Sequence, residues 1–299
     1  MAQAATLKDP GTYIGDPIVD YVKTPQLVDT IIETGAAKGV LPLGQLLVRG
    51  MMGGAFLAYG TSMAFFGTAQ GMIPILAALL FPTGFIVINI LQTDLETGYF
   101  CYVPIAFLHK RISALGMCKA FFWVYVANLI GSLIYAWILW AALTMIGNAP
   151  DASGIGAVAI KTATAKTLHY IPFGAAGWWT CFIKGILCNW WVSMGVVLPF
   201  ATRSAVGKAL LTFVPIYMFF CMGWEHLIVN MYIMPFAMLM GAHITWGTWW
   251  LWNEIPTTLG NFVGGFLFTG LAVGWTYFAR KKSEQVVTTP GEPVAAILR

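Results

Sequence analysis

Six apolar windows follow one another along this 299-residue chain, and they constrain its fold more than any other feature. A helix needs about 20 apolar residues to cross the hydrocarbon core of a bilayer. Only 9% of the residues are charged, against about 25% in an ordinary soluble domain. We therefore predict an all-α integral membrane protein with six transmembrane helices. The windows cover residues 47–67, 72–108, 114–146, 176–200, 208–241 and 256–279.

The second and fifth windows are too long for one plain span, and each contains a polar interruption. These interruptions read QTDLETG at residues 92–98 and GWEH at residues 223–226. A helix break in a membrane frees backbone N–H and C=O groups, which is tolerated only where they line a cavity or are buried in protein. We predict that the second and fifth helices are broken and that a pathway passes between the two breaks.

Three landmarks recur in the two halves at nearly one period. Asp94 and Glu225 each precede a proline by ten residues, at an offset of 131. The segments that begin at Asn128 and Asn261 are separated by 133 residues, and the Arg-Gly and Lys-Gly pairs ending at residues 50 and 185 are separated by 135. An odd number of spans per repeat inverts the second copy, as in transporters built from inverted repeats. We predict an inverted 3+3 repeat; chance similarity between short motifs in glycine-rich helices is the alternative.

The positions of the basic residues predict the orientation. With six spans, thirteen of the sixteen Lys and Arg residues fall on one side of the membrane, and only Lys161, Lys166 and Lys184 fall toward the other. The positive-inside rule then places both termini in the cytoplasm. We predict a cytoplasmic N-terminal segment at 1–45 with an amphipathic helix capped at Thr24-Pro25, a channel domain at 46–280 and a cytoplasmic tail at 281–299.

Ionisable residues inside the membrane are costly and mark functional candidates. The predicted spans contain three acids, Asp94, Glu96 and Glu225, together with His226. We expect Glu225 and Asp94 to be structural acceptors for freed amides or a neighbouring Asn. We expect His226 to handle protons, because an adjacent acid can tune an imidazole.

Two asparagines belong to the same candidate pathway. Asn230 is either a helix–helix hydrogen-bond partner or a substrate contact, and Asn189 is expected beside the pore because it lies in the middle of a span.

Other protein classes fit the sequence less well. The five cysteines form no Cys-x-x-Cys pair, so neither a disulfide framework nor a zinc site is indicated. An intramembrane enzyme would need a motif such as His-Glu-x-x-His or Gly-x-Ser-x-Gly, and the chain contains neither. An aquaporin-like channel for neutral solutes should show Asn-Pro-Ala at each break, which is also missing. We expect no catalytic residue, cofactor, metal or nucleic-acid partner.

Four features together resemble the formate/nitrite transporter family over residues 45–280: GILCNWWV (185–192), GWEHLIVNMY (223–232), NEIPTTLGN (253–261) and the inverted repeat. The resemblance implies an aquaporin-like protomer in a homopentamer within the cell (inner) membrane. It also implies permeation of small monovalent anions or their acids, with formate or nitrite as the default. Members selective for bicarbonate, hydrosulfide or lactate are the alternative within the family.

The resemblance also assigns roles by motif. It makes His226 the central pore histidine, Glu225 its neighbouring acid, Thr97 the threonine that faces the histidine, and Asn189 the fourth-span asparagine. It places Lys166 at the outer funnel. The apolar constrictions are assigned to Phe81, Phe85 and Phe219.

The first break departs from the family pattern, which reads like GAELFTGN. Glu96 occupies a position that is normally apolar, and a charge there could repel anions, pair with a lysine or face away. For transport we expect basic vestibules to attract the anion and His226 to supply or relay a proton, after which the neutral acid passes the phenylalanines. Uptake should then rise as the external pH falls.

Overall fold

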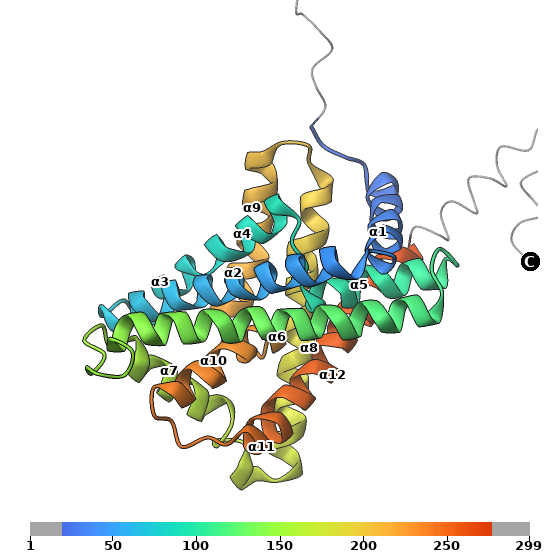
Figure 1. The fold of residues 1–299 in the computed structure, drawn as a ribbon. Helices are drawn as coiled ribbons and strands as arrows, with labels where there is room; N and C mark the ends of the chain where they lie inside the picture. Colours follow the sequence, from blue (N-terminus) through green and yellow to red (C-terminus); the bar gives the residue numbers. More distant parts are fainter. Residues whose placement is uncertain (1–19, 277–299) are drawn as a thin grey trace, which may run out of the picture.

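The computed structural model describes residues 20–276, which form helices and contain no β-strand (Figure 1). The predicted tail at 281–299 lies outside the described residues. Five elements precede the first break: α1 (Thr24–Gly39), α2 (Leu43–Ala69), α3 (Pro74–Ala77), η1 (Ala78–Leu80) and α4 (Pro82–Leu91). The others are α5 (Glu96–Leu108), α6 (Ala114–Thr144), α7 (Ile155–Lys166), η2 (Ile171–Phe173), α8 (Ala175–Val197), η3 (Leu198–Ala201), α9 (Ala205–Cys221), α10 (Leu227–Leu239), α11 (Trp246–Trp249), η4 (Trp250–Glu254), α12 (Ile255–Gly265) and η5 (Phe266–Leu271).

The N-terminal helix α1 buries one face against α5. Leu27, Val28, Ile31 and Ile32 form that face, with the spacing of an amphipathic helix. The expected cap at Thr24-Pro25 is wrong: the N-cap position is Lys23, whose side chain makes no capping bond. Pro25 suits the first turn because the N–H that it lacks would have no helical partner there.

Four segments are long and apolar enough to cross a membrane: Pro74–Leu91, Ala114–Thr144, Ala175–Ala201 and Trp246–Thr276. The first predicted window meets this criterion only if α2 is joined to α1, from which it is bent by 114°. The fifth window is divided into α9 and α10, of 17 and 13 residues. Length and composition alone therefore support four spans, or five with the bent pair, among the described residues.

Both helix breaks lie where the sequence predicts them. Residues 92–95 separate α4 from α5, and residues 222–226 separate α9 from α10. Each break turns through a left-handed residue, Gln92 at φ 54° and Gly223 at φ 66°. The first break is shorter than expected, because α5 already begins at Glu96.

Two long helix pairs frame the breaks. α2 packs along α6, as Figure 1 shows, and α8 packs along α12. Glycines allow this close approach: a Cβ on Gly131 would overlap the Met51 carbonyl, and one on Gly264 would overlap the Ile186 carbonyl. These positions are related by the offsets of 133 and 135 residues, so the packing contact recurs in both halves.

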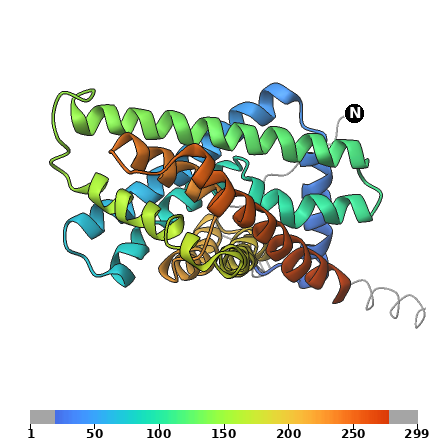
Figure 2. The same ribbon diagram turned by 90° about the horizontal axis from the view of Figure 1, so that it is seen from below.

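The last long helix begins ten residues earlier than the predicted window. It starts at Trp246, contains π-helical turns at η4 and η5, and crosses the molecule obliquely when viewed from below (Figure 2). The predicted window left out residues 246–255, which contain the polar Asn253 and Glu254. Both are completely buried and have hydrogen-bond partners within the protein, which is how a membrane helix accommodates such residues.

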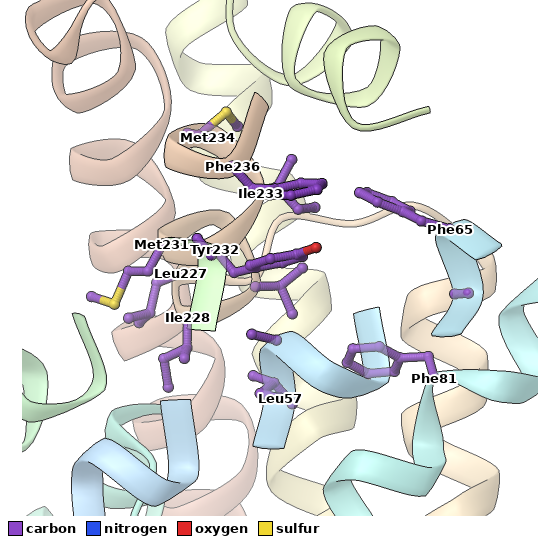
Figure 3. Close-up of a cluster of buried hydrophobic side chains, with 14 of the residues drawn as sticks. Leu57, Phe65, Phe81, Leu227, Ile228, Met231, Tyr232, Ile233, Met234 and Phe236 are labelled. Carbon is purple, nitrogen blue, oxygen red and sulfur yellow. The ribbon is translucent and has the colours of Figure 1, made fainter. Parts of the chain in front are cut away.

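The buried core surrounds α10. Figure 3 shows Leu57 and Phe65 of α2, and Phe81, beside the side chains of Leu227–Phe236. Residues 227–237 of α10 are all buried, so this half-helix is enclosed by protein rather than by lipid.

Candidate functional site

The first break carries Asp94, a completely buried carboxylate that is paired with two cations. Lys38 of α1 binds Oδ1, and Nε of Arg49 lies 2.9 Å from Oδ2. The carboxylate was expected to accept freed amides or an Asn; this is wrong for its side chain, which binds cations instead. A paired charge is far less costly to bury than an isolated one, and the pairing joins α1 and α2 to the break.

The second break carries Glu225, whose carboxylate accepts four hydrogen bonds. Oε2 accepts from Lys166 Nζ, Asn230 Nδ2 and Asn253 Nδ2, each at 3.0 Å. Oε1 accepts from the Tyr170 hydroxyl at 2.8 Å. Since these donors come from α7, α10, η4 and the loop before α8, Glu225 gathers four segments around the break, and Asn230 is the neighbouring Asn that the sequence suggested.

Each break is held by one asparagine in the same way. Asn128 Nδ2 donates to the carbonyls of Gly50 and Asp94 at 2.8 Å, and its Oδ1 accepts from the Glu96 N–H at 2.9 Å.

Asn261 repeats this set in the second half. Its Nδ2 donates to the carbonyls of Gly185 (2.9 Å) and Glu225 (2.8 Å), and its Oδ1 accepts from the Leu227 N–H at 3.0 Å. The three landmarks of the sequence repeat therefore bind one another in each half.

His226 begins α10. Its Nδ1 accepts from the N–H groups of Ile228 (3.2 Å) and Val229 (3.3 Å). A nitrogen that accepts hydrogen bonds carries no proton, so the neutral imidazole holds its proton on Nε2. Nε2 is buried and has no hydrogen-bond partner among the described residues.

Phenylalanine rings pack directly against the imidazole. Phe219 lies 5.3 Å from the His226 ring, and Phe81 meets Phe219 edge-on at 5.5 Å. Phe220, which the sequence did not single out, stacks on Phe81 at 3.9 Å. Phe85 is also completely buried in the same core. The expected constriction residues are thus together, with His226 at their edge.

A cavity of about 600 Å³ lies on the side of the second break. Its lining includes Lys161, Lys166 and Lys184, together with Phe219 and Glu225. Lys166 is occupied: besides Glu225, its ammonium donates to the Trp224 carbonyl at 3.1 Å and the Gly223 carbonyl at 3.4 Å. Lys184 has one such bond, to the Tyr170 hydroxyl at 3.2 Å, and no carboxylate partner within residues 20–276.

A smaller cavity of about 120 Å³ lies beside the first break. It is lined by Lys38 and Lys208, with Thr93 and Leu95 of the break. Each break is therefore accompanied by a cavity with basic residues in its wall.

Asn189 links the two halves near the breaks. Its Nδ2 donates to the carbonyls of Thr97 (3.1 Å) and Asn261 (2.7 Å). The Thr97 hydroxyl and the Oδ1 atoms of Asn189 and Asn230 are buried without a partner among the described residues. No hydrogen bond joins the side chains of Thr97 and His226, since the Thr97 hydroxyl and His226 Nε2 both lack a partner among the described residues. Unpartnered polar atoms grouped near two breaks are the pattern expected of a lined pathway.

Glu96 and two unanticipated residues complete the description. Glu96 is buried, and no lysine pairs with it in the described part of the chain. Lys38 was not predicted as the partner of Asp94, and no sequence signal indicates it. Glu254 is a fourth buried acid; including the NEIPTTLGN motif in the last span would have found it. The described residues hold no cluster of three or more His, Cys, Asp or Glu that could bind a metal.

Two broken helices inside an apolar helical protein, each with a basic cavity beside its break, are the architecture of a membrane transport protein. The sequence comparisons agree. The family model described as formate/nitrite transporter matches residues 25–275, and the chain belongs to this family. It is a multi-pass membrane protein.

The matches with individual relatives extend over nearly the whole length of each relative. A probable formate transporter of Methanothermobacter thermautotrophicus is 32% identical over 79% of this chain and 90% of its own. An uncharacterized transporter, YrhG, of Bacillus subtilis is 31% identical over 89% and 97%. The formate channel BtFdhC of Bacillus thuringiensis is 26% identical over 87% and 95%. These relatives are transporters and channels rather than enzymes.

Solved structures show the same fold. An FNT family ion channel superposes with a TM-score of 0.70 at 23% identity, covering 84% of this chain and 98% of that one. A pentameric formate channel with formate bound superposes with a TM-score of 0.64 at 24% identity, covering 80% and 98%.

Proposed function

We propose that this protein moves small monovalent anions across the membrane as their conjugate acids, with formate or nitrite as the leading substrates. The observation that carries the proposal is the 600 Å³ cavity, whose lysines lie at one end of a buried aromatic constriction beside His226. Formate is the substrate named for several relatives.

The lysines favour an anion in the vestibule, whereas the phenylalanines exclude it. Moving a bare carboxylate-sized ion into low dielectric costs on the order of 20 kcal/mol in the idealised Born estimate. Protonating an acid of pKa about 4 at pH 7 costs about 4 kcal/mol, since each pKa unit is about 1.36 kcal/mol. The neutral acid is therefore the species that passes Phe81, Phe85 and Phe219.

The geometry favours hydrogen bonding over proton donation as the role of His226. Nδ1 of His226 accepts two backbone N–H groups, so a second ring proton on this nitrogen would point at two hydrogen-bond donors. The resulting imidazolium would also lie at the positive, N-terminal end of the α10 dipole. His226 then offers Nε2–H to the passing molecule, and the proton that neutralises the anion comes from the vestibule water.

Thr97 and Asn189 lie beside this route. Asn230 and Glu225 also lie beside it and hold the second break in place. The repeated asparagine and glycine contacts favour six spans in an inverted 3+3 arrangement, with domain limits at 1–45, 46–280 and 281–299. The pentameric neighbour favours a homopentamer with lipid around it. The family favours the cell (inner) membrane, and the charge distribution favours cytoplasmic termini.

Uptake by purified protein in liposomes tests the proposal. A panel of formate, nitrite, lactate, hydrosulfide and bicarbonate should include at least one substrate whose uptake rises steadily as the external pH falls from 8 to 4. Uptake that is flat over this range, or uptake of glycerol and no anion, would exclude the mechanism. Protein-free liposomes measure the background of acid diffusion.

A further inference from the structure

Two buried acids have no basic partner in the described chain. Asp94 and Glu225 each pair with a cation. Glu96 and Glu254 are 2% and 0% exposed, and no ion pair among residues 20–276 includes either of them. The proposed mechanism uses neither group.

Glu254 lies in the π-helical turn η4 and has two neutral donors. The Tyr125 hydroxyl of α6 donates to Oε1 at 3.0 Å, and Trp249 Nε1 donates to Oε2 at 3.1 Å. The hydrogen bond from Tyr125 thus ties Glu254 to α6. π-helical turns such as η4 occur frequently at functional sites.

The face of α5 that carries Glu96 and Phe100 packs at the same seam between α6 and the last helix. Phe100, one turn after Glu96, meets Phe121 of α6 and Phe262 of α12, each at 5.4 Å. Positions four residues apart share a helix face. Moving one turn from this ring cluster toward the break thus brings Glu96, Tyr125 and Thr258 together.

Two further observations agree with that placement. The Glu96 N–H is bound to Asn128, one turn beyond Tyr125. The buried Oε2 of Glu96 has no hydrogen-bond partner among the described residues. Tyr125 thus stands between two acids that belong to different helices.

Two carboxylates in one apolar seam cannot both be ionised without a compensating cation. The charged groups around the seam do not supply one, because the carboxylates of Asp94 and Glu225 are already paired with their own lysines and arginine. The other titratable neighbours, Tyr99 and Tyr125, are phenols.

We propose that Glu96 and Glu254 hold a buried proton through Tyr125, and that this pair positions the start of α5, including Thr97, and contributes a separate pH response to transport. The proposal rests on the proposed function for its transport part only. When the proton is lost, the two carboxylates repel, and a negative charge develops beside the first break. Uptake then falls at alkaline pH for a reason independent of His226.

Infrared spectroscopy of the lipid-reconstituted protein tests the buried proton without any transport assay. At neutral pH the wild type should show a protonated carboxyl C=O band that Glu96→Gln and Glu254→Gln diminish. Tyr125→Phe should shift the band, because it removes the bridging hydroxyl and leaves both acids in place. Glu33→Gln is the matched control, since Glu33 is exposed and paired with Arg111, and it should leave the band unchanged.

Uptake as a function of pH tests the coupling. Both Gln variants should keep the uptake rate of the wild type at acidic pH and shift the alkaline decline to higher pH, and the double variant should shift it no further. A band unchanged in both Gln variants overturns the proposal, and pH profiles that superimpose on the wild type overturn its transport part. If no substrate is transported by the wild type, the proposed function fails, and the infrared result still decides the buried proton.

Discussion

The side chain of Asn189 donates a 2.7 Å hydrogen bond to the carbonyl of Asn261 and a second bond to Thr97. Asn261 in turn holds the second break, and Thr97 follows the first. The Asn189 side chain of α8 therefore joins the two halves, because it donates to a backbone carbonyl of α5 and to one of α12.

Replacing Asn261 by Leu should destabilise the protein by about 3 kcal/mol or more. The change removes the side-chain bond to the Gly185 carbonyl and leaves the Glu225 carbonyl and the Leu227 N–H buried without their partner, and each unsatisfied group costs about 1–3 kcal/mol. Thermal unfolding in detergent measures the effect, and Asn128→Leu should behave alike. Asn148→Leu is the control, because Asn148 is exposed and bonds only the Met145 carbonyl; equal stability of the Asn261 and Asn148 variants would contradict the assigned role.

Replacing His226 by Asn should preserve pH-dependent uptake, because Asn both caps helices well and offers an N–H donor. His226→Phe can do neither; it should lower the stability by about 1 kcal/mol through the lost cap and reduce uptake strongly. Uptake assays at several pH values and thermal unfolding of both variants provide the comparison. Loss of the pH dependence in the Asn variant would instead establish His226 as the direct proton donor.

Lys184 should contribute more to anion capture than Lys166, because Lys166 is committed to Glu225 and two carbonyls. Lys184→Gln should raise the KM for the anion roughly two- to fivefold, equivalent to about 0.5–1 kcal/mol, and weaken the dependence on ionic strength. Lys166→Gln should mainly lower the thermal stability, since it leaves a buried carboxylate without its cation.

Lys119→Gln, on an exposed position of α6, is the charge-matched control for both lysines. If Lys119→Gln and Lys184→Gln raise the KM equally, the effect of the Lys184 variant comes from a general loss of positive charge and not from a role of Lys184 in anion capture.

Chemical labelling of Cys221, which lines the large cavity, tests to which side of the membrane this cavity opens. A membrane-impermeant thiol reagent added outside intact cells should label Cys221 and block uptake. Cys221→Ser, which keeps the exposed Cys118, should be insensitive to the same reagent. Block by the reagent only in inside-out vesicles would place this vestibule in the cytoplasm.

The sequence predicted the helical class, both breaks and the residues that carry them, because apolar length and polar interruptions are local properties. It also predicted that Asp94, Asn128 and Gly50 have counterparts in the second half. It could not predict which side chains pair across the fold. Lys38 reaches Asp94 across 56 positions of the chain. Glu254 lies in a π-helical turn, and its partners Tyr125 and Trp249 come from α6 and α11.

The imidazole of His226 has two tasks at once, because Nδ1 caps the start of α10 and Nε2 has no hydrogen-bond partner among the described residues. Few amino acids could replace His226 in the course of evolution. A replacement must accept hydrogen bonds from two amide N–H groups in order to keep the start of the helix, and it must also be small and uncharged. Asn, Ser and Thr meet these conditions, and most other substitutions would be removed for misfolding before their effect on permeation was ever exposed to selection.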